Sequence, residues 1–189
     1  MPFGAGDLPQ SGVQADPVTR GVTYLRWLQS LALEPAMIAI PPHPNDQMRL
    51  CRWLGNHIGI LNEQLATYVA ACQACFHPEE RQIIQVFATP LNPEYQVDAI
   101  CNVLTSPISI LVDPGRVVPQ DWRKLVAHEV AHAQVGSPGH DDRFRDIMTH
   151  LCLGLGLEPP PASLSETRLL RQWPPCQSTV DPHAFWLRG

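Results

Sequence analysis

Apolar residues recur every three or four positions over two stretches in the first half of the chain, which predicts two amphipathic helices. The first covers about residues 24–32. The second follows a proline-rich segment and runs from Asn45, a candidate N-cap, to about Cys72. Gly55 and Gly59 lie inside this second stretch, so we expect a bend or a break in the helix there.

Three short runs rich in β-branched residues follow in the middle of the chain. Each run is bounded by Pro, Asn, Ser or Asp, a pattern typical of strands separated by turns. The runs are Ile83–Phe87, Ala99–Leu104 and Ile108–Val112. Because they are close together in the sequence, we expect them to form a small, mostly antiparallel sheet.

Helical spacing returns after a turn at residues 113–115. One helix is expected from Asp121, a good N-cap, to about Val135, and the Gly-Ser-Pro-Gly run at 136–139 ends it. A second amphipathic helix follows over about residues 144–155. Helices packed on a small sheet place the chain in the α+β class.

A length of 189 residues suits one compact domain with short extensions. We divide the chain into a flexible N-terminal tail (1–18), a central domain (19–157) and a proline-rich C-terminal extension (158–189). Inside the extension, the capping-box pair Ser163 and Glu166 predicts one short helix. An apolar run near the C-terminus could fold back over the domain.

Composition excludes several functional classes. The net charge is -5 and no Lys/Arg run occurs, which argues against a general electrostatic grip on nucleic acid. No apolar stretch reaches the roughly 18 residues of a membrane span. The N-terminus lacks the basic start and apolar core of a secretory signal, and the six cysteines are scattered. We therefore expect a cytoplasmic protein with reduced thiols and no membrane partner.

The residues from His128 to His132 form an HExxH motif inside the third predicted helix. Positions i and i+4 share one helix face, so both imidazoles can bind a single metal ion. Glu129 is offset around the helix by roughly 100°, beside the ion, where it can take a proton from water held by the metal. A shuffled chain of this composition would contain about 0.014 such motifs, so chance does not explain it.

A catalytic zinc site requires a third protein ligand. His140 is the first candidate, because it follows the Gly-Ser-Pro-Gly turn and would lie on the first turn of the next helix. His150 and Glu158 are the alternatives. A metzincin would place its third histidine at position 138, which is proline here.

The motif His128-Glu-Val-Ala-His132, followed by His140 and Phe144 in the pattern H-x-x-x-F, resembles SprT-like and WLM-type zinc metallopeptidases. The resemblance covers roughly residues 83–157. It implies an α+β zincin fold in which His128, His132 and His140 bind Zn²⁺ and Glu129 is the general base. The implied reaction is hydrolysis of a peptide bond by zinc-activated water.

Two features differ from the DNA-directed members of this family. Those proteins tend to be basic and often carry a C-terminal four-cysteine zinc ribbon, whereas this chain is acidic and has only Cys176 beyond residue 152. We therefore expect a peptide or an unfolded protein as substrate. A catalytically silent zincin-fold adaptor and a DNA-linked protease remain the alternative functions, and the oligomeric state is not predicted.

Several supporting roles have more than one candidate. Residues that could hold the imidazoles by their second nitrogen are Asp141, Asp142 and Asp146. Candidates for a donor that stabilises the developing oxyanion are His150, Tyr95 and Arg143. The strand at 108–112 is the expected edge for an extended peptide. Cys72 and Cys75 resemble half a zinc knuckle but continue an apolar stripe, so we interpret them as buried thiols.

Overall fold

The computed structural model describes residues 16–161 and 167–187. Helix α1 (Pro17–Leu31) begins at Asp16, whose side chain accepts hydrogen bonds from the amides of Val18 and Thr19. The predicted first helix therefore starts about two turns earlier than its apolar stripe indicated. Of the predicted tail, residues 1–15 lie outside the described residues, and residues 17 and 18 belong to α1.

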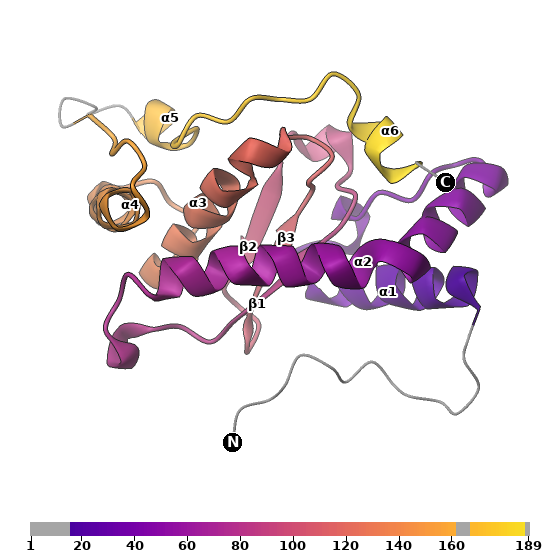
Figure 1. Ribbon diagram of the computed structural model, residues 1–189, viewed down its shortest axis with the longest axis horizontal. Helices are drawn as coiled ribbons and strands as arrows, with labels where there is room; N and C mark the ends of the chain where they lie inside the picture. The colour runs from indigo at the N-terminus through magenta and orange to yellow at the C-terminus, as the bar shows by residue number, and fades with distance from the viewer. Residues whose placement is uncertain (1–15, 162–166, 188–189) are drawn as a thin grey trace.

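Helix α2 (Pro44–Gln73) runs across most of the molecule (Figure 1). The helix does not break at its glycines, since it continues through both. A Cβ atom on Gly55 would lie 2.0 Å from the carbonyl oxygen of Pro17 in α1, whereas one on Gly59 would meet nothing within 4 Å. Gly55 is thus a point of close contact between two helices. The N-cap is His43, and Asn45 lies inside the helix.

The sheet consists of β1 (Ile84–Ala88), β2 (Ala99–Asn102) and β3 (Ile108–Val112), in the order β1-β3-β2. β2 and β3 are antiparallel as expected, but β1 is parallel to β3. The sheet is therefore mixed rather than mostly antiparallel. The physical reason is the connection at 89–98. It places β2 one strand position away from β1, and the hairpin between β2 and β3 then brings β3 into the central position.

The two sheet edges have different surroundings. At the β1 edge, the amide of Ala88 donates to the Asn62 side chain over 2.8 Å, and the Tyr24 hydroxyl donates to the Ala88 carbonyl over 2.8 Å. These side chains take the place of a neighbouring strand. The prediction that residues 108–112 form an open edge is wrong, because β3 is central. β2 is instead the edge strand, and it packs beside the helix at Trp122–Val135.

Helices α3 (Trp122–Val135) and α4 (Asp142–Leu155) match the two helices predicted after the sheet. The indole of Trp122 donates to the carbonyls of Pro114 and Val117, which fixes the start of α3. Gly136 ends the helix with φ of 72°, a left-handed conformation that glycine adopts without strain. Shorter 3₁₀ turns lie at Pro35–Met37, Pro78–Glu80, Pro93–Tyr95 and Pro119–Asp121.

The C-terminal residues return over the rest of the chain, passing from α5 (Thr167–Leu170) to α6 (Pro182–Trp186) along one side of the molecule (Figure 1). Trp186 is 2% exposed, and its indole nitrogen donates to Asp113 over 2.8 Å. The expected folding back of the apolar run is therefore confirmed. The predicted capping box at Ser163 and Glu166 lies outside the described residues.

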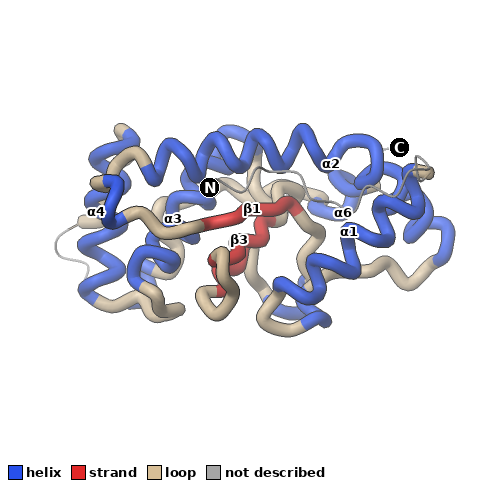
Figure 2. Tube along the Cα trace, turned by 90° about the horizontal axis from the view of Figure 1, so that it is seen from below, coloured by secondary structure: helices blue, strands red, loops and turns tan. Residues whose placement is uncertain are grey.

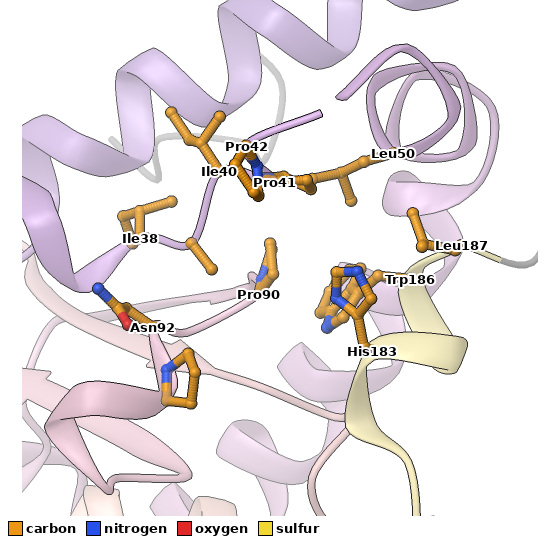
Figure 3. A pocket seen from close by; sticks show the side chains of 12 residues that line it. Ile38, Ile40, Pro41, Pro42, Leu50, Pro90, Asn92, His183, Trp186 and Leu187 are labelled. Carbon is orange, nitrogen blue, oxygen red and sulfur yellow. The ribbon is translucent and has the colours of Figure 1, made fainter. Parts of the chain in front are cut away.

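A cavity of about 460 Å³ lies between α6, the proline-rich link before α2 and the loop after β1 (Figure 3). Its walls are mainly apolar, and none of the three histidines of the predicted metal site lines it. Figure 2 shows α2 running above the strands, and α1 packs against α2. No helix among the described residues is long and apolar enough to cross a membrane.

Candidate metal centre

Three histidines from two different segments converge beside the C-terminal half of α3. The Nε2 atom of His128 lies 3.2 Å from Nε2 of His132 and 3.1 Å from Nε2 of His140. The potential ligand atoms of the three residues all lie within 4.8 Å of one another. The structure thus brings together the three histidines that the sequence suggested.

Two of these imidazoles are held from behind by backbone carbonyls. Nδ1 of His128 lies 2.7 Å from the carbonyl oxygen of Trp173, and Nδ1 of His132 lies 3.0 Å from that of Ser137. A carbonyl oxygen can only accept, so each Nδ1 carries the proton in these contacts. The Nε2 lone pairs are then free to bind a metal ion.

Burial keeps the three imidazoles neutral. It lowers the pKa of His128 to about 3 and that of His140 to about 4, and it also lowers the pKa of His132. The charges of His132 and Arg171 contribute further to the shift at His140. Neutral imidazoles are the form that binds metal ions, so the site does not need to lose protons at neutral pH.

Phe144 of α4 forms an apolar wall behind the three histidines. Its side chain is fully buried, and its ring centroid lies 5.0 Å from that of His128, 4.6 Å from that of His132 and 4.7 Å from that of His140. An apolar neighbour of this kind limits the access of water to a metal site.

The turn between α3 and α4 places the third histidine. After Gly136, the Ser137 hydroxyl accepts from the amide of Gly139, and the Ser137 carbonyl contacts His132. Helix α4 is capped by Asp141, whose carboxylate accepts from the amide of Phe144 over 3.0 Å. His140 therefore lies just before the N-cap, not on the first turn of the helix as predicted.

Glu129 is buried, with 6% of its surface exposed. Burial, and secondly the charge of Asp98, raise the pKa of Glu129 to about 8. The Glu129 charge in turn contributes, after burial, to a raised pKa of the Cys101 thiol. Both neighbours belong to the β2 region, so the carboxyl group lies between α3 and the edge strand.

The other predicted ligands lie elsewhere. His150 contacts the carbonyl of Cys75 over 2.7 Å, at the far end of α4. Among the described residues, the group of potential metal ligands contains neither His150 nor Glu158. Asp141 caps α4, and Asp142 pairs with Arg145 over 2.6 Å. The imidazoles of His128 and His132 are thus held by two backbone carbonyls rather than by the predicted aspartates. The sequence could not predict these acceptors, because every residue has a backbone carbonyl.

The candidates for an oxyanion donor are not supported by their contacts. The Tyr95 hydroxyl donates to Glu34 over 2.9 Å, and His150 is engaged with Cys75 as described. No contact of the Arg143 side chain is seen among the described residues. Arg171, which the sequence did not single out, lies close enough to the centre to lower the pKa of His140.

Cys72 and Cys75 end α2 and belong to no potential metal group within the described part of the chain. Cys72 is fully buried, and burial raises its pKa to about 12. The prediction that it is a buried thiol is confirmed. All six cysteines are free.

The donor set fits zinc. In a tetrahedral site with Zn–N bonds of ordinary length, ligand nitrogens lie about 3.3 Å apart, close to the 3.1 and 3.2 Å found here. Three neutral imidazoles would leave a fourth position open, as catalytic zinc sites require. No family model, curated protein or solved structure matches this chain.

Proposed function

We propose that the protein is a zinc-dependent metallopeptidase of the SprT-like or WLM-like kind, with His128, His132 and His140 as zinc ligands and Glu129 as general base. The observation that carries the proposal is the convergence of the three Nε2 atoms next to a buried glutamate of an HExxH helix. When bound, zinc would act as a Lewis acid and lower the pKa of water at the open position.

The protein's own groups prepare the site for this chemistry. The carbonyls of Trp173 and Ser137 fix the tautomer and the ring orientation of two ligands before any metal arrives. The fully buried Phe144 keeps the back of the site dry, which strengthens electrostatic interactions there.

Glu129 is suited to moving a proton in both directions. In the metal-free site burial raises the pKa of Glu129 to about 8, and the charge of a bound zinc ion would lower this pKa toward neutral pH and favour the carboxylate form that acts as a base. General acid–base catalysis is most efficient when the catalytic pKa is near the working pH. The carboxylate accepts a proton from the attacking water, and as the acid it returns a proton to the leaving amine of the cleaved peptide bond.

The outer edge of β2 is the proposed site for an extended peptide. The amide of Asp113 donates to the carbonyl of Asp98, and in an antiparallel pair such contacts alternate. The backbone groups of Ala99 and Cys101 therefore point away from β3. No strand covers this edge in the part of the chain that the structure describes. An extended peptide could pair there beside Glu129.

We also propose a cytoplasmic location and a peptide or unfolded-protein substrate. Six free cysteines suit a reducing compartment. The net charge of -5 disfavours a DNA-linked role, because binding to phosphates requires positive charge.

The substitution Glu129→Gln tests the catalytic role. It should leave zinc binding intact and abolish cleavage of an unfolded protein such as denatured casein, because the amide cannot accept the proton. The substitution Glu158→Gln is the matched control, since Glu158 is exposed and lies apart from the three histidines. It should retain both properties.

The outcomes separate the alternatives. Cleavage that persists in Glu129→Gln would remove Glu129 from the mechanism. Zinc bound by the wild type without hydrolysis of any unfolded protein would favour the adaptor function. Cleavage that requires DNA, with a steep dependence on salt, would favour the DNA-linked protease.

A further inference from the structure

The C-terminal strap, which we define as residues 173–179, lies along one face of α3. The amide of Gln177 donates to the Asp121 carboxylate over 2.8 Å, and the Lys124 ammonium donates to the Pro175 carbonyl over 3.3 Å. The last contact in this series is the one from His128 Nδ1 to the Trp173 carbonyl. Positions 121, 124 and 128 share one helix face, so strap and helix run antiparallel.

Further contacts hold the strap to the segment that precedes α3. The Val118 amide donates to the Gln177 carbonyl over 2.9 Å, and the Thr179 amide donates to the Arg116 carbonyl over 2.8 Å. Trp186, beyond the strap, is buried with its indole on Asp113. The strap is therefore held by backbone pairing at one end and ends on a metal ligand at the other.

The side chain of Asp121 binds the strap instead of capping α3. This residue occupies the N-cap position, but its side chain caps no helix amide. Its carboxylate instead accepts from Gln177 and pairs with Lys124 over 2.7 Å. An N-cap side chain normally accepts from a helix amide, so the contact with the strap takes the place of that hydrogen bond.

We infer that the C-terminal strap is a positioning element of the metal centre: it fixes His128 in the orientation that binds metal. This inference rests on the proposed zinc site. A ligand held by such an outer contact binds metal more tightly than a ligand free to rotate. Because coupling between two binding events is reciprocal, zinc should also tighten the docking of the strap.

The first test compares zinc affinity in two double variants of the full chain. Asp121→Ala with Lys124→Ala removes two of the five strap contacts described above and leaves all three histidines in place. We expect zinc affinity, measured by competition with a chromophoric chelator, to fall about tenfold. The control is Asp142→Ala with Arg145→Ala, which removes an equivalent i,i+3 ion pair from α4 that does not contact the strap. Its affinity should stay at the wild-type value.

The second test uses the wild-type chain alone, so it does not depend on the folding of a variant. Added zinc should slow hydrogen exchange at the amides of Gln177 and Thr179, which donate to Asp121 and Arg116. Exchange in α1, which packs chiefly on α2, should change less.

Each outcome has a distinct meaning. A wild type that binds zinc while the strap exchanges at the same rate with and without it would overturn the inference and leave the proposed function standing. Equal zinc affinity in the strap variant, the control and the wild type would do the same. A wild type that binds no zinc would remove the proposed function and the inference together.

Discussion

At the scale of single residues, burial gives two neighbours in α3 opposite pKa shifts. It lowers the pKa of His128 to about 3 and raises that of Glu129 to about 8. In both cases the low-polarity surroundings favour the neutral form. The metal-free site is therefore an uncharged cluster. Neutral imidazoles suit metal binding, and a carboxyl group with a pKa near neutrality suits proton transfer.

These shifts predict how the stability of the metal-free protein depends on pH. The histidines bind fewer protons folded than unfolded, so their contribution is lost as pH falls below about 6.5 toward 4 and 3. Glu129 binds more protons folded than unfolded between pH 4.5 and about 8, so its contribution is lost as pH rises through that window. Stability should therefore be greatest near pH 6.5.

The substitution Glu129→Gln isolates one part of this profile. Between pH 6.5 and 8 the free energy of unfolding of the chelator-treated wild type should fall by about 2 kcal/mol because of Glu129. The variant cannot ionise at this position and should not show that fall. Urea unfolding at both pH values measures the difference. An equal fall in both proteins would contradict the assignment.

The sequence predicted which histidines come together better than it predicted the groups that hold them. His128 and His132 follow from helical spacing alone, and His140 follows from the turn that the Gly-Ser-Pro-Gly run predicts. The carbonyls of Ser137 and Trp173 could not be predicted, because every residue has a carbonyl and only the fold decides which one meets an imidazole.

At the scale of elements, close contact between α1 and α2 depends on glycine. A Cβ on Gly21 would lie 2.1 Å from the Cys51 carbonyl oxygen, and one on Gly55 would lie 2.0 Å from that of Pro17. Both carbonyls belong to the backbone, which cannot move aside without disturbing a helix. In the sequence Gly55 appears as a weak point of a helix, and its role depends on a neighbouring helix that sequence periodicity does not identify.

Alanine substitutions at two glycines of α2 should have opposite effects. Gly55→Ala forces α1 away and should destabilise the protein by about 2 kcal/mol. Gly59→Ala meets open space and should stabilise it by about 1 kcal/mol, because alanine favours the helix. Thermal unfolding of both variants beside the wild type gives the comparison. An increase in stability from both would show that the helices are not in such close contact.

The strands were located from their composition, but their pairing was not. β-branched runs and turn residues predicted all three strands to within a few residues. Nearness in sequence favoured simple hairpins, whereas the connection at 89–98 crosses to the far side of β3. That path leaves β2, next to Glu129, as the edge strand beside the site.

At the scale of the whole molecule, the proline-rich C-terminal residues connect the two ends of the structure. The described part from 167 to 187 passes along α3, contacts His128 and ends with Trp186 buried on Asp113 (Figure 1). Composition predicted an extension rich in turns, and it could not show that this segment contacts a histidine of the candidate metal site. The α+β class was predicted from the order of helices and strands, and the structure has it.

The zinc content of the purified protein, measured by elemental analysis, tests the central claim most directly. We predict one zinc per chain in the wild type and in His150→Ala, and almost none in His140→Ala, because His140 lies beside His128 and His132 whereas His150 contacts the Cys75 carbonyl. A wild type that holds no zinc after zinc is supplied, or a His140→Ala variant that keeps its full zinc content, would contradict the three-histidine site.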